Sequence, residues 1–228
     1  MIHQNQRIIG LITIGQSPRP DIIKPIAEAI GYNFTLLESG ALDGINEQRI
    51  SDLQAGGARK PLATVLNNGQ AVILNATAIV PLINQQVDSL TEQGADFTLL
   101  LCTHEFPSEQ LSHKLTQPCK LMQSKVEQAL PKGNLSVVCP HAGQVESTHT
   151  QFARANVRVS VSNFNPHEGL RVKQLAEQLT LKQPDLISLD CFSFSVDFAA
   201  NLGERLGVPV YCPSGLTAQL IMNEIKLP

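Results

Sequence analysis

The amino-acid sequence predicts an α/β fold of two similar lobes, each a mostly parallel sheet flanked by helices, with a cleft between them. Two observations predict it. Short apolar runs alternate with amphipathic stretches along the whole chain, and one strand segment of the first half recurs in the second half. Alternating strands and helices favour parallel sheets that helices cover. The 228 residues suffice for one large domain or two small lobes.

The first half contains four apolar strand segments and two amphipathic helical segments. The expected strands cover residues 8–14, 33–38, 71–74 and 97–101, and the expected helices cover residues 21–31 and 81–93. Gly31 and Gly94 close the two helices, as glycine commonly does. Asn67-Asn68-Gly69, within residues 63–71, is typical of a hairpin or turn. The polar, proline-containing residues 107–118 are the expected crossing between the lobes.

The second half repeats the alternation of strands and helices. Its expected strands cover residues 135–138, 158–161, 185–189 and 208–211, and its expected helices cover residues 144–155, 169–181, 196–206 and 217–225. We expect the last strand and the last helix to return to the first lobe. The predicted first lobe therefore comprises residues 1–117 and 209–228, and the predicted second lobe comprises residues 118–208.

The recurring segment carries a cysteine at the same place in each half. The stretch from Asp96 to Cys102 is similar to the stretch from Asp185 to Cys191, because each is an apolar strand with a cysteine six residues after an aspartate. In open α/β sheets, ligands bind outside the carboxyl ends of the strands. One thiol at that position in each half predicts a pseudo-twofold molecule in which Cys102 and Cys191 face each other across the cleft.

The composition excludes several classes of function. Aromatic residues make up 4% of the chain, tryptophan is missing and the net charge is −3, so nothing favours a nucleic-acid partner. The apolar residues 8–14 are too few to span a membrane, and residues 1–7 lack the pattern of an export signal. Five widely spaced cysteines without a CxxC pair favour reduced thiols in the cytoplasm. Without zinc-site spacing we expect no metal, and without a glycine-rich phosphate-binding motif nothing favours a dinucleotide or a P-loop nucleotide.

Two opposed thiols suit proton transfer at a carbon atom. A thiolate on one face of the substrate removes a proton, while a thiol on the other face returns one. The reference pKa of cysteine, about 8.5, leaves both forms accessible near neutral pH. A cysteine at a strand end is more often a small buried hydrophobic residue, and we keep that interpretation for Cys119, Cys139 and Cys212. The matched positions of Cys102 and Cys191 favour a functional interpretation for that pair.

A turn after the first strand is a candidate anion site. Gly15, Gln16 and Ser17 offer backbone N–H groups and a hydroxyl, and Arg19 offers a charged clamp. The alternative is a proline-stiffened turn in which Ser17 only caps the next helix.

Other polar residues follow strand ends further along the chain. Asn75 and Thr77 either bind a carboxylate or cap the next helix. His104 either tunes the thiol two residues before it or is an exposed loop histidine, and His141 is a second histidine in a loop that faces the predicted cleft. Asp190 either raises the pKa of the cysteine that follows it, as a like charge, or orients a partner. The neighbours of the two cysteines complete the expected substrate-binding set: Thr103, Phe192 and Ser193.

Three segments of the chain resemble the AroM family. Residues 11–22, LITIGQSPRPDI, are similar to its amino-terminal signature. Residues 100–107, LLCTHEFP, and residues 189–191, LDC, fall where the family has its two cysteine segments. Leu42-Asp43-Gly44 and Asn68-Gly69-Gln70 are similar as well, so the resemblance covers nearly the whole chain.

AroM proteins in turn resemble distant members of the aspartate/glutamate racemase superfamily. That superfamily includes amino-acid and hydantoin racemases, maleate isomerase and arylmalonate decarboxylase. The resemblance implies two α/β lobes with a cofactor-free site between them. Because oligomers are common in the superfamily, a homo-oligomer is a further expectation.

This sequence departs from the superfamily pattern near both cysteines. Thr103-His104 and Phe192-Ser193 stand where amino-acid racemases tend to have Asn-Thr and Thr-His. Gln16-Ser17 stands where Asp-Ser is usual, and His104 stands where we expect glycine in AroM proteins. The expected scaffold does not depend on these residues, whereas an amino-acid substrate does not follow from the resemblance.

The leading hypothesis is a cytoplasmic, cofactor-independent racemase or isomerase that acts on a small carboxylate, with Cys102 and Cys191 as acid and base. With only one thiol positioned for chemistry, isomerisation or decarboxylation becomes possible. The sequence leaves two alternatives open. One is a small-molecule-binding or sensor protein that uses the same cleft, and the other is a hydrolase with Cys102 as nucleophile and His104 as base.

Overall fold

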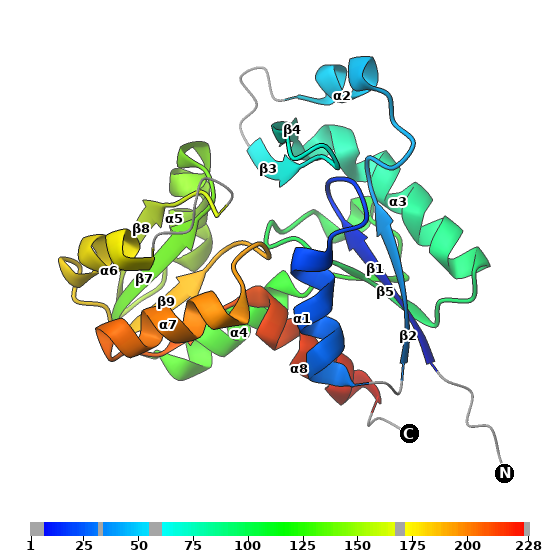
Figure 1. Ribbon diagram of the computed structural model, residues 1–228. Helices are drawn as coiled ribbons and strands as arrows, with labels where there is room; N and C mark the ends of the chain where they lie inside the picture. The colour runs from blue at the N-terminus through cyan, green and yellow to red at the C-terminus, as the bar shows by residue number, and fades with distance from the viewer. Residues whose placement is uncertain (1–6, 32–33, 55–60, 167–171, 226–228) are drawn as a thin grey trace, which may run out of the picture.

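A computed structural model of the chain describes residues 7–31, 34–54, 61–166 and 172–225, with side chains described up to residue 222. It contains two four-stranded sheets in which every strand pairing is parallel, and helices flank both sheets (Figure 1). The predicted α/β class with two lobes is confirmed. Residues 1–6, part of the segment in which we expected no export signal, lie outside the described residues.

The first sheet has the strand order β2-β1-β5-β6. Its strands are β1 (Arg7–Thr13), β2 (Phe34–Gly40), β5 (Phe97–Leu100) and β6 (Leu115–Thr116). The central strand β1 contributes to two cores, because Ile9 and Leu11 pack with α1 (Pro20–Ile30) whereas Ile12 packs with α3 (Ala76–Glu92). Burial on both faces explains why this strand is a continuous apolar run in the sequence.

The second sheet has the strand order β8-β7-β9-β10. Its strands are β7 (Gly133–Cys139), β8 (Val157–Asn163), β9 (Leu186–Leu189) and β10 (Val210–Tyr211). One face packs with α6 (Val172–Thr180) and α7 (Val196–Leu206), and the other packs with α4 (Cys119–Ala129) and α5 (Val145–Phe152). Counted along the chain, both sheets have the order second, first, third, fourth strand, so the two lobes share one topology.

The last strand lies in the second lobe, contrary to our expectation. We assigned residues 209–228 to the first lobe, but β10 pairs in parallel with β9, with Val210 opposite Ile187. The following helix α8 (Pro213–Ile225) packs against α1, and it also contacts α4 (Figure 1). The chain therefore completes the second sheet before its last helix reaches the first lobe, a pairing that no local sequence pattern specifies.

An antiparallel hairpin projects from the first lobe. Its strands are β3 (Pro61–Val65) and β4 (Ala71–Asn75), and Gly69 in the turn has a positive φ of 82°, which favours glycine. This confirms the turn predicted at Asn67-Asn68-Gly69. In Figure 1 the hairpin stands beside the gap between the two lobes.

Several helices differ from the sequence-based expectation. We did not predict α2 (Glu47–Leu53) or α4, and residues 107–118, expected to be only a crossing, contain a short 3-10 helix and the edge strand β6. Helix α3 begins at Ala76 rather than at residue 81, because Asn75 caps it and Pro81 is tolerated inside the helix. The predicted helix over residues 169–181 is described only from Val172 onward. None of the helices in the described ranges combines the length and apolar character that crossing a membrane requires.

Candidate active site

Cys102 and Cys191 occupy equivalent positions in the two lobes. Each lies two residues beyond the last residue of the third strand of its sheet, Leu100 of β5 and Leu189 of β9. In both sheets this strand adjoins the first strand, where the strand order reverses and ligands commonly bind. The internal repeat detected in the sequence is therefore a repeat of tertiary position as well.

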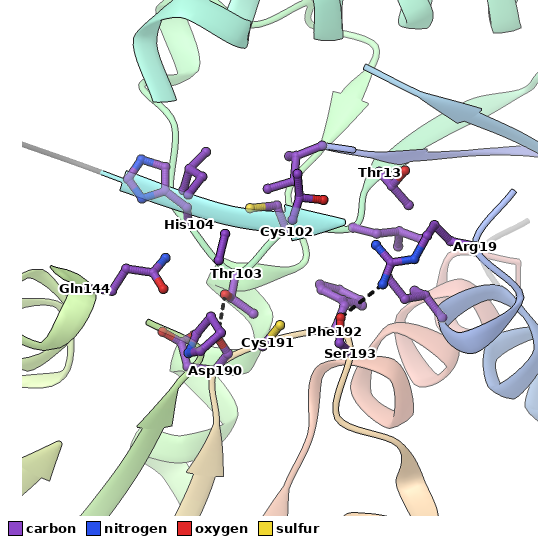
Figure 2. A pocket seen from close by; sticks show the side chains of 17 residues that line it. Thr13, Arg19, Cys102, Thr103, His104, Gln144, Asp190, Cys191, Phe192 and Ser193 are labelled. Carbon is purple, nitrogen blue, oxygen red and sulfur yellow. Dashed lines mark hydrogen bonds between the residues drawn. The ribbon is translucent and has the colours of Figure 1, made fainter. Parts of the chain in front are cut away.

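Both cysteines line one cavity of about 470 Å³, including its opening to solvent. The lining comes from strand ends and loops of both lobes, from the first turn of α1 and from the hairpin strand β3. It consists of Thr13, Ile14, Arg19, Ile22, Leu62, Ala63, Thr64, Leu101, Cys102, Thr103, His104, Pro140, Gln144, Asp190, Cys191, Phe192 and Ser193. Figure 2 shows Cys102 and Cys191 entering this pocket from opposite lobes.

The two thiols are held in different surroundings. Cys102 is 8% exposed, and burial raises its pKa far above the ordinary range. Burial also raises the pKa of Cys191, but hydrogen bonds from Ser193 and the positive charge of Arg19 oppose that shift. The negative charge of Asp190 raises the pKa of both thiols. A positive charge thus lowers the pKa of Cys191, whereas no positive charge is among the main influences on the pKa of Cys102.

Asp190 lies between the end of β9 and Cys191, with its carboxyl group buried. Its N–H donates to the carbonyl of Val138 at 2.8 Å, and its own carbonyl accepts a hydrogen bond from Thr103 Oγ1 at 3.1 Å. The hydroxyl of Thr148 donates to Oδ2 at 3.4 Å. Burial raises the pKa of this carboxyl to about 7, so its charge changes near neutral pH.

Arg19 brings a positive charge from the first lobe to the second. Its side chain is almost fully buried and donates to both carboxylate oxygens of Asp21, from Nε at 2.8 Å and from Nη2 at 2.6 Å. Nη2 also donates to Ser193 Oγ at 3.1 Å, across the cleft (Figure 2). Together with the Thr103–Asp190 bond, this contact ties both cysteine loops to the opposite lobe.

The predicted anion site at Gly15, Gln16 and Ser17 lies outside the pocket lining. Gln16 Oε1 accepts from the N–H of Asn67 at 2.9 Å, and the N–H and hydroxyl of Ser17 both donate to Asp43. A Cβ at Gly15 would collide with Thr64 Oγ1. These residues form a turn, as the alternative expected, and the turn contacts the hairpin. Ser17 does not cap the next helix, whose N-cap is Arg19 and which has no side-chain cap.

Three further candidates also lie outside the lining. Asn75 accepts a hydrogen bond from the N–H of Thr77 at 3.1 Å, which is the capping alternative, and Thr77 is exposed. His141 Nδ1 accepts from the N–H of Gly143 at 3.0 Å and caps a short 3-10 helix. The side chains of Asn75 and His141 each satisfy a local backbone donor.

The other expected residues do line the pocket: Arg19, Cys102, Thr103, His104, Cys191, Phe192 and Ser193. The ring of His104 contacts Phe106 edge to face, with a centroid separation of 4.8 Å. No three His, Cys, Asp or Glu side chains in the described part of the chain lie close enough together to hold a metal ion.

Sequence reasoning missed several parts of the lining. Thr13 is 1% exposed, and its hydroxyl finds no hydrogen-bond partner among the described residues. Gln144 enters from the loop after β7, and residues 62–64 enter from the hairpin. Thr13 was within reach of sequence reasoning, because it ends the first strand of a parallel sheet. Nothing local to Gln144 or to the hairpin points to the cleft.

A family model described as AroM protein matches residues 9–225 of the chain. No curated protein sequence matches this chain. Solved structures match along nearly the whole chain at low identity. An aspartate racemase of Picrophilus torridus is 12% identical, with 96% of this chain and 94% of that chain covered and a TM-score of 0.58.

Two further solved structures are of enzymes named for other reactions. A maleate cis-trans isomerase of Nocardia farcinica bound to TRIS is 15% identical, with 97% and 93% of the two chains covered and a TM-score of 0.59. Unliganded arylmalonate decarboxylase is 14% identical, with 97% and 93% covered and a TM-score of 0.59. These likenesses establish a shared fold, that of the racemase, isomerase and decarboxylase group.

Proposed function

The chain belongs to the AroM family, and we propose that it is a cofactor-independent enzyme that transfers a proton at a carbon atom of a small carboxylate. One observation carries the proposal: two thiols from equivalent strand ends line the same pocket from opposite lobes. A carbon held between them meets a base on one face and an acid on the other. That arrangement serves racemisation or isomerisation.

The different surroundings of the thiols suggest their resting roles. Cys191, hydrogen-bonded by Ser193 and close to Arg19, is the thiolate that takes the proton from carbon. Cys102, whose pKa is raised by burial and lowered by no neighbouring positive charge among its main influences, is the thiol that gives its proton to the opposite face. In the reverse direction the roles exchange, so that one proton and one negative charge are conserved in each turnover.

Arg19 and Ser193 are our candidates to hold the substrate carboxylate. Removal of a proton next to a carboxylate places negative charge on its oxygens, and fixed donors stabilise that charge in the transition state. Nε and Nη2 of Arg19 are engaged by Asp21 and Ser193, which leaves Nη1 with two N–H donors. All five cysteines are free thiols, and we place the enzyme in the reducing cytoplasm.

Proton NMR in D₂O tests this function. The protein is incubated with amino acids, hydroxy acids, hydantoins and unsaturated diacids, and loss of a carbon-bound proton signal is followed. We expect loss of the signal with the wild type and with the control Cys212→Ala, which removes a buried thiol outside the pocket. Cys102→Ala and Cys191→Ala should each slow full turnover by about 10³-fold.

The same experiment separates the competing functions. Full turnover that survives in either pocket variant contradicts two-thiol chemistry, and dependence on Cys102 alone indicates a hydrolase or a one-thiol decarboxylase. A binding protein has one observation in its favour, which is that burial raises the pKa of both thiols. For a binding protein, ligand signals would broaden in all variants without any loss of a carbon-bound proton.

A further inference from the structure

The charged side chains of the pocket stand on two sides of the cysteine pair. Among the residues that line it, Arg19 and Asp190 are the only members of the Asp, Glu, Lys and Arg group. In Figure 2, Arg19 and Ser193 lie on one side of Cys102 and Cys191, whereas Asp190 lies on the other, with His104 and Gln144. The remaining lining is mostly apolar. The pocket is therefore dipolar, with its reacting groups between the two charges.

We propose that this pocket selects a dipolar substrate, an amino carboxylate whose carboxylate faces Arg19 and whose ammonium group faces Asp190. The inference rests on the proposed function, which places the reacting carbon between the two thiols. It goes further, because it distinguishes an amino acid from a hydroxy acid or a diacid of the same size.

The Arg19 end is built to receive an anion. Arg19 is held rigidly by its two bonds to Asp21, and the guanidinium edge that remains carries two donors. The Thr13 hydroxyl is a second donor, and it is nine-tenths or more buried with no partner among the described residues. A buried hydroxyl without a partner costs stability, and a bound carboxylate would satisfy it.

The Asp190 end is built to receive a cation. The carboxyl is 7% exposed, and it forms no ion pair with any residue in the described ranges. The hydrogen bonds to its side chain come from two neutral hydroxyls, those of Thr103 and Thr148. A buried carboxylate without a positive partner is costly, which is why burial raises its pKa to about 7. An ammonium group of the substrate would supply the missing charge.

A diacid fits this pocket poorly for the same reason. Its second carboxylate would lie against Asp190, and two buried like charges repel strongly. A hydroxy acid avoids that repulsion but leaves the buried carboxylate without a counter-charge. The charge pattern thus ranks amino acids first, hydroxy acids second and diacids last.

Isothermal titration calorimetry at pH 8 tests this ranking. The probes are the common amino acids, the 2-hydroxy acid with the carbon skeleton of each, and saturated diacids of two to six carbons. We expect the tightest ligand of the wild type to be an amino acid that binds about tenfold or more tightly than its hydroxy analogue. A diacid or a hydroxy acid as the tightest ligand, or no binding by any probe, would overturn the inference.

Asp190→Asn, which keeps the shape and removes the charge, sharpens the test. Its preference for the amino acid over the hydroxy acid should fall to about threefold or less, and its affinity for diacids should rise. The control Asp197→Asn removes an exposed carboxylate from the first turn of α7 and should leave the wild-type ranking in place. An unchanged ranking in Asp190→Asn contradicts the proposal. If that variant does not fold, the wild-type ranking still decides.

Failure of this inference can be told apart from failure of the proposed function. Loss of a carbon-bound proton from a hydroxy acid or a diacid, but from no amino acid, supports proton transfer and overturns the dipolar substrate. Selective binding of an amino acid without proton exchange supports the dipolar pocket and overturns the enzyme.

Discussion

The loops that carry Cys102 and Cys191 start at equivalent positions in the two sheets, but the two thiols have different surroundings. Each follows the third strand of its sheet by two residues, and both reach the same pocket. Cys102 belongs to the apolar core of the first lobe, and its side chain is 8% exposed. Around Cys191 it places a buried carboxyl, a hydroxyl and, across the cleft, a guanidinium. The comparison teaches that the duplicated topology sets where the thiols stand, whereas unduplicated neighbours set how tightly each holds its proton.

The difference has a mechanistic consequence. Two thiols in identical surroundings would hold their protons equally tightly. Here the positive charge of Arg19 and the hydrogen bonds from Ser193 favour the thiolate of Cys191, and the negative charge of Asp190 opposes it. The balance depends on one titrating carboxyl, Asp190, which is also the residue that has no counterpart in the first loop, where Leu101 precedes the cysteine.

Of the changes that would test the difference between the two loops, Asp190→Asn should have the largest effect, and the quantity measured is the free energy of unfolding. The pKa of Asp190 is about 7 in the folded protein and is raised from 3.8. A carboxyl with a raised pKa favours folding most below its unfolded pKa, and that advantage is lost as pH rises through its folded pKa. The neutral amide avoids the loss. We expect the variant to exceed the wild type at pH 8 by about 2 kcal/mol in the free energy of unfolding in urea.

The gain should disappear at pH 4, where most of the Asp190 carboxyl groups are neutral in the folded wild type. Asp197→Asn is the control, since its exposed carboxylate should change stability little at either pH. An equal difference between the Asp190 variant and the wild type at both pH values would mean that charge is not the cause.

A smaller effect should appear in the reactivity of the two thiols. Cys191 is partly exposed, and the positive charge of Arg19 opposes the rise in its pKa. Iodoacetamide should therefore alkylate Cys191 about tenfold faster than Cys102 at pH 8. Peptide mass spectrometry at timed intervals gives both rates in one sample. Equal rates, or faster labelling of Cys102, would reverse our assignment of base and acid. Buried Cys212 serves as the unreactive reference.

Removing the hydroxyls that tie the cysteine loops across the cleft should have the smallest effect. Thr103→Val removes the bond to the Asp190 carbonyl, and Ser193→Ala removes the bond from Arg19. Each should cost about 1 kcal/mol in the free energy of unfolding. Only Ser193→Ala should also slow alkylation of Cys191, because it removes a donor to that thiol. Slower labelling in both variants would point to loss of cleft geometry instead.

Much of the fold was predictable because its signals are local. The buried strand β1, the Asn67-Asn68-Gly69 turn and the repeat of strand and cysteine all depend on residues close together in the sequence. The place of β10 was not predictable in this way, since its two residues carry no pattern that distinguishes one sheet from another. Helix α3 was placed too late because Pro81 resembled a first helical residue, whereas the Asn75 cap decided its start.

For the site, the sequence by itself determined that two cysteines follow equivalent strands, because spacing after a strand is a local property. Only the tertiary structure decided which polar side chains accompany them. Asn75 and His141 cap local helices, whereas Thr13 and Asp190 line the pocket. The physical reason is burial: whether a carboxyl is 7% exposed, and so titrates near pH 7, depends on atoms brought from residues as distant as Thr103.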